Sequence, residues 1–153
     1  MEHDICLDDR FFEIMMLNKK GYCCSQIMAI LTLRNMGRED ADVVRALGGL
    51  CYGLGHSGDT CGVLSGGACI LALCAGKGSD KETAREFLPL MISELVEWFR
   101  QKTNDSYGGS GCDDILLKNP DRRACLTLIV ETYQKVLSIL ESHGLFLVGM
   151  IDG

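Results

Sequence analysis

Cysteines are the residues of this 153-residue chain that are most able to do chemistry, and there are nine of them. An odd number fits poorly with a full set of disulfides, so we expect metal ligands, reactive thiols and some small buried hydrophobes. No two cysteines have the CxxC spacing. That excludes a thioredoxin-type motif and a zinc knuckle. Function must therefore come from thiols that separate segments bring together.

Four of the cysteines lie at or near the predicted start of a helix. Cys61 and Cys112 each follow a glycine-rich loop, Cys24 opens one helix, and Cys125 lies in the second turn of the last one. Helix starts offer unpaired backbone N–H groups and a positive dipole end, which stabilise anionic sulfur. The pattern predicts a lowered pKa for Cys61 and marks all four residues as candidate ligands for a metal or a cluster.

The other cysteines receive ordinary interpretations. Cys69 and Cys74 lie within the apolar central helix and are predicted to be buried hydrophobes, while Cys6 lies in an N-terminus expected to be mobile. Cys51 precedes a glycine-rich turn and is left open between a packed residue and a peripheral redox thiol. Cys23 should point about 100° away from Cys24, outside the site, and should tolerate serine at a cost of no more than about 1 kcal/mol.

The elements that must position these thiols are predicted to be helices, because apolar residues recur with helical spacing and no run alternates convincingly. We therefore predict an all-α, single-domain bundle spanning residues 1–153, built around a buried, glycine-rich central helix. Gly62 and Gly66 on that helix should let a neighbouring helix approach closely. The predicted helices are Asp9–Leu17, Ser25–Met36, Glu39–Leu47, Thr60–Gly76, Ser79–Lys102 bent at Pro89, and a last one opened by Asn119 and Pro120 and closed by Gly144; the tail Leu145–Ile151 is apolar enough for a strand.

The segment 53–58, GLGHSG, has the GxGxxG spacing of dinucleotide-binding folds. That fingerprint must follow a parallel strand, and here it follows a helical segment, so we expect no nucleotide cofactor. The glycines instead favour positive φ angles and a tight backbone path next to Cys61. His56 lies inside this turn, but the three histidines form no spaced ligand pair.

Charge and hydropathy exclude several classes of function. The net charge is −6 and no long Lys/Arg cluster occurs, which disfavours binding to nucleic acid or to a membrane surface. The longest uncharged run, Thr60–Gly76, has seventeen residues, short of the roughly 20 that a membrane span needs. The N-terminal residues lack the pattern of a secretory signal, so we expect a cytoplasmic protein with mostly reduced thiols.

Three features occur together in this chain: the triplet Cys24-Ser25-Gln26, the segment Gly58-Asp59-Thr60-Cys61-Gly62 followed by Gly66, and the lone Cys112 and Cys125. The combination resembles the redox-active family called C_GCAxxG_C_C over about residues 11–140, with Val63 where the family has alanine. The resemblance implies a bacterial or archaeal helical domain with a redox role. Related domains occur beside haem-binding segments in split-Soret cytochromes, but this chain has no CxxCH and should carry no covalent haem.

Three functions follow from the residues and the resemblance. The leading hypothesis is an iron–sulfur cluster held by Cys24, Cys61, Cys112 and Cys125, serving electron transfer or redox sensing with a redox partner protein. The alternative is a thiol–disulfide oxidoreductase with Cys61 as the nucleophile. The third is a structural zinc site in a partner-binding bundle. The oligomeric state stays open, with a homodimer as one candidate.

Overall fold

The computed structural model describes residues 2–147, with side chains from residue 9 onward. These residues form helices and contain no β-strand, only an isolated bridge between Thr60 and Gly111, so the all-α prediction is confirmed. The first helix begins at Glu2, well before the predicted Asp9, and includes Cys6. The elements are α1 (Glu2–Lys19), α2 (Cys24–Asn35), α3 (Ala41–Leu47), a short 3₁₀ turn (Gly48–Leu50), α4 (Cys51–Leu54), α5 (Gly62–Ala75), α6 (Leu88–Tyr107), α7 (Cys112–Lys118) and α8 (Arg123–Ser142).

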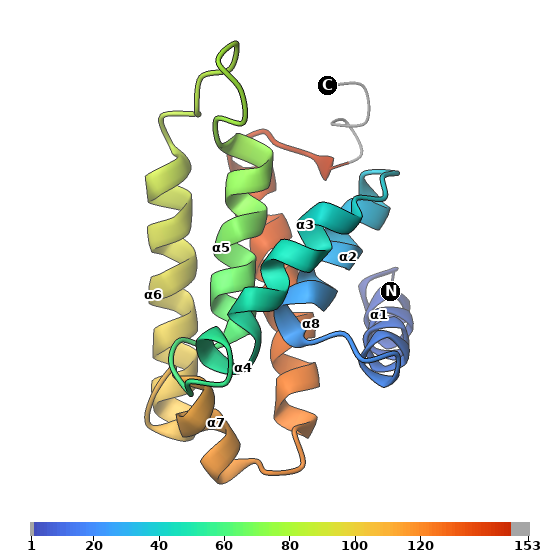
Figure 1. The fold of residues 1–153 in the computed structure, drawn as a ribbon, viewed down its shortest axis with the longest axis vertical. Helices are drawn as coiled ribbons and strands as arrows, with labels where there is room; N and C mark the ends of the chain where they lie inside the picture. The colour runs from blue at the N-terminus through green and yellow to red at the C-terminus, as the bar shows by residue number, and fades with distance from the viewer. Residues whose placement is uncertain (1, 148–153) are drawn as a thin grey trace.

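Helix α5 is the central helix that the uncharged run predicts. It packs against α2, α6 and α8. In Figure 1, α5, α6 and α8 run along the long axis, α3 crosses them obliquely, and α7 closes the lower end. Val63, Ile70 and Leu71 are each at most 1% exposed, because α5 has neighbours on several sides. Its apolar composition therefore reflects burial inside the bundle.

Two glycines of α5 let α2 approach closely. A Cβ atom on Gly66 would lie 3.0 Å from Ser25 Cα, and one on Gly62 would lie 3.1 Å from Cys24 Sγ. Both distances are shorter than ordinary van der Waals contact. The prediction that these two residues permit close helix packing is confirmed. As a consequence, the start of α2, with Cys24, lies directly against the start of α5.

The predicted helix over Ser79–Lys102 is wrong in its first part. Glu82 accepts hydrogen bonds from the Gly78 N–H (3.0 Å) and the Ser79 hydroxyl (3.4 Å), which close a turn, and residues 77–87 form a loop. Helix α6 begins only at Leu88. Pro89 lies in its first turn, where a missing N–H costs no hydrogen bond, so it starts the helix and does not bend it.

The last helix also begins later than predicted. Asn119 and Pro120 lie in the turn after α7, and α8 begins at Arg123, so Cys125 belongs to its first turn. Gly144, with φ of +77°, ends the helix region as expected. Residues 145–147 form no strand, and the rest of the predicted tail strand lies outside the described residues.

Candidate functional site

The four candidate cysteines all lie at helix starts and line one cavity. Cys24 and Cys112 are the first residues of α2 and α7, Cys61 directly precedes α5, and Cys125 is in the first turn of α8. All four are free thiols. The structure thus brings together the four residues that the sequence singled out, and it does so through four helix N-termini.

A short antiparallel contact joins the loops that carry two of these thiols. The Cys61 N–H donates to the Ser110 carbonyl (3.2 Å), and the Cys112 N–H donates to the Asp59 carbonyl (2.7 Å). Gly58 lies against the Asp113 carboxylate with φ of +73°, where a side chain would not fit. The glycine-rich approach therefore provides the tight backbone path that the sequence predicts next to Cys61, and its hydrogen bonds also join this path to the loop of Cys112.

The cavity between the thiols has a volume of about 50 Å³. Apolar side chains line it together with the four thiols, and they lower the local dielectric constant. Polar lining groups come from Asn18, Tyr52 and Arg122. The apolar walls are formed by Ile27, Ile115, Leu116, Leu126 and Ile129.

Burial governs the protonation of these thiols. It raises the pKa of Cys125 to about 11, with the neighbouring Cys24 and Cys112 adding to the effect. Burial likewise raises the pKa of Cys24, Cys112 and Cys61, and for Cys61, only 4% exposed, it outweighs the lowering by the Val63 N–H. The predicted low pKa of Cys61 is therefore wrong. Without a bound metal, the four groups are protonated near neutral pH.

Tyr52 and Arg122 cover the cavity where it meets solvent. The Arg122 guanidinium donates to the Tyr52 hydroxyl (2.7 Å) and lies 4.4 Å from the centre of the Tyr52 ring. The His56 ring stacks on Tyr52 at 4.2 Å. Arg122 also lowers the pKa of Cys24, Cys112 and Cys125, although less than burial raises it. Sequence reasoning missed both Tyr52 and Arg122.

Backbone strain is concentrated in this cover. In the described part of the chain, the non-glycine residues with positive φ are Tyr52 (55°), Leu54 (66°), His56 (66°) and Arg122 (62°). Side chains in this region cost of order 1 kcal/mol or more each and persist only when surrounding contacts hold them. The rest of the fold therefore holds the cover in a conformation that its own residues disfavour.

Cys23 and Cys51 form a disulfide, with Cα atoms 5.8 Å apart. Cys23 is the residue before α2 and also lines the cavity, while Cys51 begins α4. The expectation that Cys23 lies outside the site is therefore wrong. The sequence leaves Cys51 open between a packed residue and a redox thiol. Its disulfide with Cys23 favours the redox thiol.

The remaining cysteines differ in exposure. Cys74 is half-buried and packs against the core, close to its prediction. Cys69 is exposed, so the prediction that it is buried is wrong: it faces away from the helices that pack on α5. Cys6 lies within the N-terminal part of α1. His143 lies at the end of α8 opposite to Cys125, where its ring contacts Phe87. His56 instead contacts Tyr52 of the cover.

The donor set fits a thiophilic group in chemistry. Four cysteine sulfurs are the ligands preferred by iron–sulfur clusters and by structural zinc. Within residues 9–147, however, no three Cys, His, Asp or Glu side chains are grouped tightly enough around one point to hold a metal ion. The thiols border one cavity, so holding either group requires them to move closer together.

A family model described as "Putative redox-active protein (C_GCAxxG_C_C)" matches residues 22–139, which is most of the chain and includes every cysteine that lines the cavity. The chain belongs to the C_GCAxxG_C_C family. This confirms the resemblance found in the sequence and makes the chain a cysteine-rich member of a redox-active family. No curated protein and no solved structure gives a significant match.

The range that matches the C_GCAxxG_C_C family includes Val63, the valine that replaces the alanine expected from the resemblance. This side chain lies on α5 and is fully buried, so the larger residue is accommodated within the core. As for membranes, no helix in the described range has the length and apolar character required to cross a bilayer.

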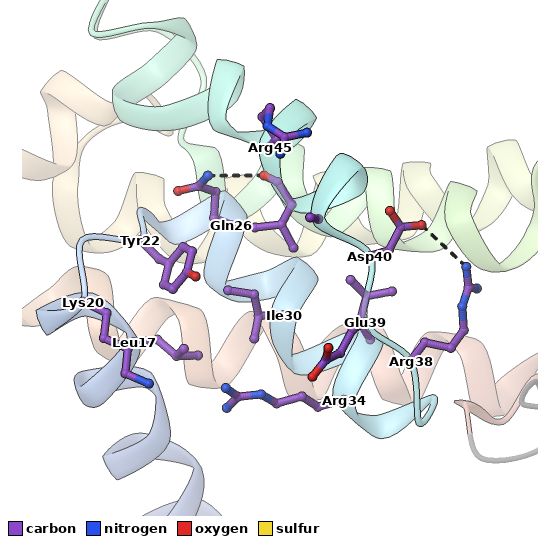
Figure 2. A pocket seen from close by; sticks show the side chains of 13 residues that line it. Leu17, Lys20, Tyr22, Gln26, Ile30, Arg34, Arg38, Glu39, Asp40 and Arg45 are labelled. Carbon is purple, nitrogen blue, oxygen red and sulfur yellow. Dashed lines mark hydrogen bonds and ion pairs between the residues drawn. The ribbon is translucent and has the colours of Figure 1, made fainter.

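A larger cavity, of about 500 Å³, lies between the end of α1, α2 and α3 and contains no cysteine. Figure 2 shows its basic and acidic side chains, with Arg38 paired to Asp40. Arg34 and Arg45 also have carboxylate partners, Glu13 and Asp42, so most of the positive charge around this cavity is compensated. The four candidate thiols all lie at the smaller cavity.

Proposed function

We propose that Cys24, Cys61, Cys112 and Cys125 bind an iron–sulfur cluster that serves electron transfer or redox sensing with a redox partner protein. The observation that carries this proposal is the convergence of four free thiols, from four helix starts, on one cavity with apolar walls. Membership of the C_GCAxxG_C_C family supports a redox role for the same residues.

When bound, such a cluster would accept and release single electrons. The protein's own groups would set how readily that happens. N–H groups at the helix starts and the Arg122 guanidinium stabilise negative charge on sulfur, which favours the reduced state, while the apolar walls disfavour added charge. Tyr52 and Arg122, by covering the cavity, would limit the access of water and oxygen to the sulfur atoms.

Thiol–disulfide chemistry is the second candidate, and the Cys23–Cys51 disulfide beside the cavity is the observation that favours it. In such a reaction Cys61 is a poor first nucleophile, because it is buried and its pKa is raised. A structural zinc site is the third candidate, since the same four sulfurs suit zinc.

Anaerobic purification followed by analysis for iron, zinc and acid-labile sulfide separates these candidates. We expect coloured protein containing iron and sulfide, with visible absorption that bleaches on reduction or on exposure to oxygen. Colourless protein with all its free thiols titratable, even after attempted reconstitution, would contradict the proposal and favour thiol chemistry. Stoichiometric zinc without sulfide would favour the structural site.

A further inference from the structure

We infer that the Cys23–Cys51 disulfide is a second redox site, which an external dithiol reduces and which controls access to the four-thiol cavity through Tyr52. The inference rests on the cavity being the redox site proposed above, but it does not depend on which group the cavity holds. Neither Cys23 nor Cys51 belongs to the proposed ligand set, so the two sites are chemically separate.

The disulfide joins two residues that each adjoin a wall of the cavity. Cys23 directly precedes Cys24, and Cys51 directly precedes Tyr52. The bond thus ties the start of α2 to the start of α4, whose second residue covers the cavity. Any movement of Cys51 away from Cys23 must also move the backbone of Tyr52.

The surroundings of the disulfide suit its reduced form as well. Ser25 is fully buried, and its hydroxyl donates to the Leu47 carbonyl at 2.7 Å. The same oxygen lies 3.2 Å from Cys23 Sγ and 3.7 Å from Cys51 Sγ. With its proton already donated, the Ser25 oxygen has lone pairs left for these sulfurs, so a thiol formed at either position finds an acceptor. Reduction therefore does not leave an unpaired S–H group next to a buried hydroxyl.

The reaction is a thiol–disulfide exchange with an external dithiol. A thiolate of the dithiol attacks one sulfur of the pair, the Cys23–Cys51 bond breaks, and a mixed disulfide forms as the other cysteine leaves as a thiolate. The second thiol of the dithiol then closes its own disulfide and releases the remaining cysteine. Two electrons pass from the dithiol to the protein, and its two protons end on Cys23 and Cys51. Both cysteines are only half-buried, which allows the first attack.

Loss of the bond should open the cover, because the disulfide is the covalent link between α4 and α2. The backbone hydrogen bonds of this loop, such as the one from the Gly58 N–H to the Tyr52 carbonyl (3.2 Å), close the loop on itself. Helix α4 has four residues, and Tyr52, Leu54 and His56 have disfavoured positive φ angles. Besides the backbone link to Cys51, the side chain of Tyr52 contacts Arg122 and His56. Relief of the strain then favours an open loop, and Gly55, with nothing within 4 Å of its Cβ position, has room to change conformation.

Timed alkylation of the metal-free protein with N-ethylmaleimide tests the inference. Trypsin releases residues 103–118 and 124–135 as peptides that contain Cys112 and Cys125 as their sole cysteines. We expect both cysteines to react on the order of tenfold faster after dithiothreitol reduces the Cys23–Cys51 pair, which corresponds to a loss of about 1.4 kcal/mol in the cost of opening. A Cys51→Ser variant should react at the fast rate with or without dithiothreitol.

Cys69, exposed in both states, gives the internal reference, and Cys69→Ser should change neither rate. The inference is overturned if mass analysis shows the pair reduced while Cys112 and Cys125 react as slowly as before, or if excess dithiothreitol leaves the pair intact in folded protein. Equal acceleration at the core-packed Cys74 would mean general loosening and would also overturn it. Because no metal is present, this result is independent of the iron and sulfide analysis, so either proposal can fail alone.

Discussion

Cys23 and Cys24 are neighbours in the chain with different partners, one bonded to Cys51 and the other facing the cavity. Cys24→Ser should abolish cluster retention, because it removes a ligand. Cys23→Ser should leave all four ligands but lower the free energy of unfolding by about 2–4 kcal/mol, since it removes a cross-link. Iron per chain and urea unfolding measure the two effects. If the substitutions exchange their effects on iron content, the ligand is Cys23 and the site is displaced by one residue.

Arg122 places a positive charge at the mouth of the cavity. Arg122→Gln should move the pKa values of Cys112 and Cys125 further upward, because the cation that favours their thiolates is gone. The midpoint of the pH dependence of alkylation at each cysteine checks this independently of any change in access. Arg122→Lys keeps the charge and should leave the midpoints near those of the unchanged protein. If Arg122→Gln does not shift the midpoints, the charge of Arg122 does not affect these thiols, and the guanidinium acts only through its contact with Tyr52.

At the residue scale, the sequence identifies the four thiols because each stands at a helix start next to characteristic neighbours. It does not reveal the pairing of Cys23 with Cys51, which depends on how α4 folds back onto α2. Nor does it reveal Tyr52 and Arg122, because their role depends on backbone conformations that these residue types rarely adopt. The raised pKa of Cys61 is caused by burial. The position of a cysteine at a helix start does not tell how deeply the folded protein buries it.

At the element scale, the approach of α2 to α5 sets the distance between Cys24 and Cys61. Gly66→Val should lower the free energy of unfolding by about 1–3 kcal/mol, because its added atoms meet the backbone of Ser25. Urea denaturation measures this loss. Gly49→Val is the matched control: nothing lies within 4 Å of its Cβ position, so a change within about 0.5 kcal/mol is expected. Equal losses at both positions would contradict the packing account.

The helices themselves follow from apolar periodicity, but two of their starts do not. Ser79 and Glu82 have the spacing of a capping box, but the Ser79 hydroxyl donates to the Glu82 carboxylate in a turn that no helix continues. Helix α6 begins only at Leu88, with Pro89 in its first turn. Asn119 and Pro120 likewise precede α8 by a turn. In both cases a local start signal is present, and tertiary packing decides where the helix begins. The shift at α8 moves Cys125 into the first turn and toward the cavity.

At the scale of the whole molecule, burial of the site makes metal retention depend on pH. Ligation requires each thiol to lose its proton, and burial raises the pKa of all four, to about 11 for Cys125. Below the pKa of a thiol, the need to release its proton lowers the apparent affinity of the protein for the metal about tenfold for each pH unit. Loss of the cluster to a chelator should therefore be fastest at pH 6 and slow steadily toward pH 9. A rate that does not vary with pH would mean that the four thiols are not the ligands.

The central claim is that four thiols from four helices hold one iron–sulfur cluster. The measurement that tests it most directly is iron and acid-labile sulfide per chain in anaerobically prepared protein, compared with single serine variants of Cys24, Cys61, Cys112 and Cys125 and with Cys74→Ser as the control. The account predicts iron and sulfide in equal amounts in the unchanged protein and in Cys74→Ser, and loss in each of the four ligand variants. Iron that persists in any three of those four variants, or protein that takes up no sulfide at all, would contradict it.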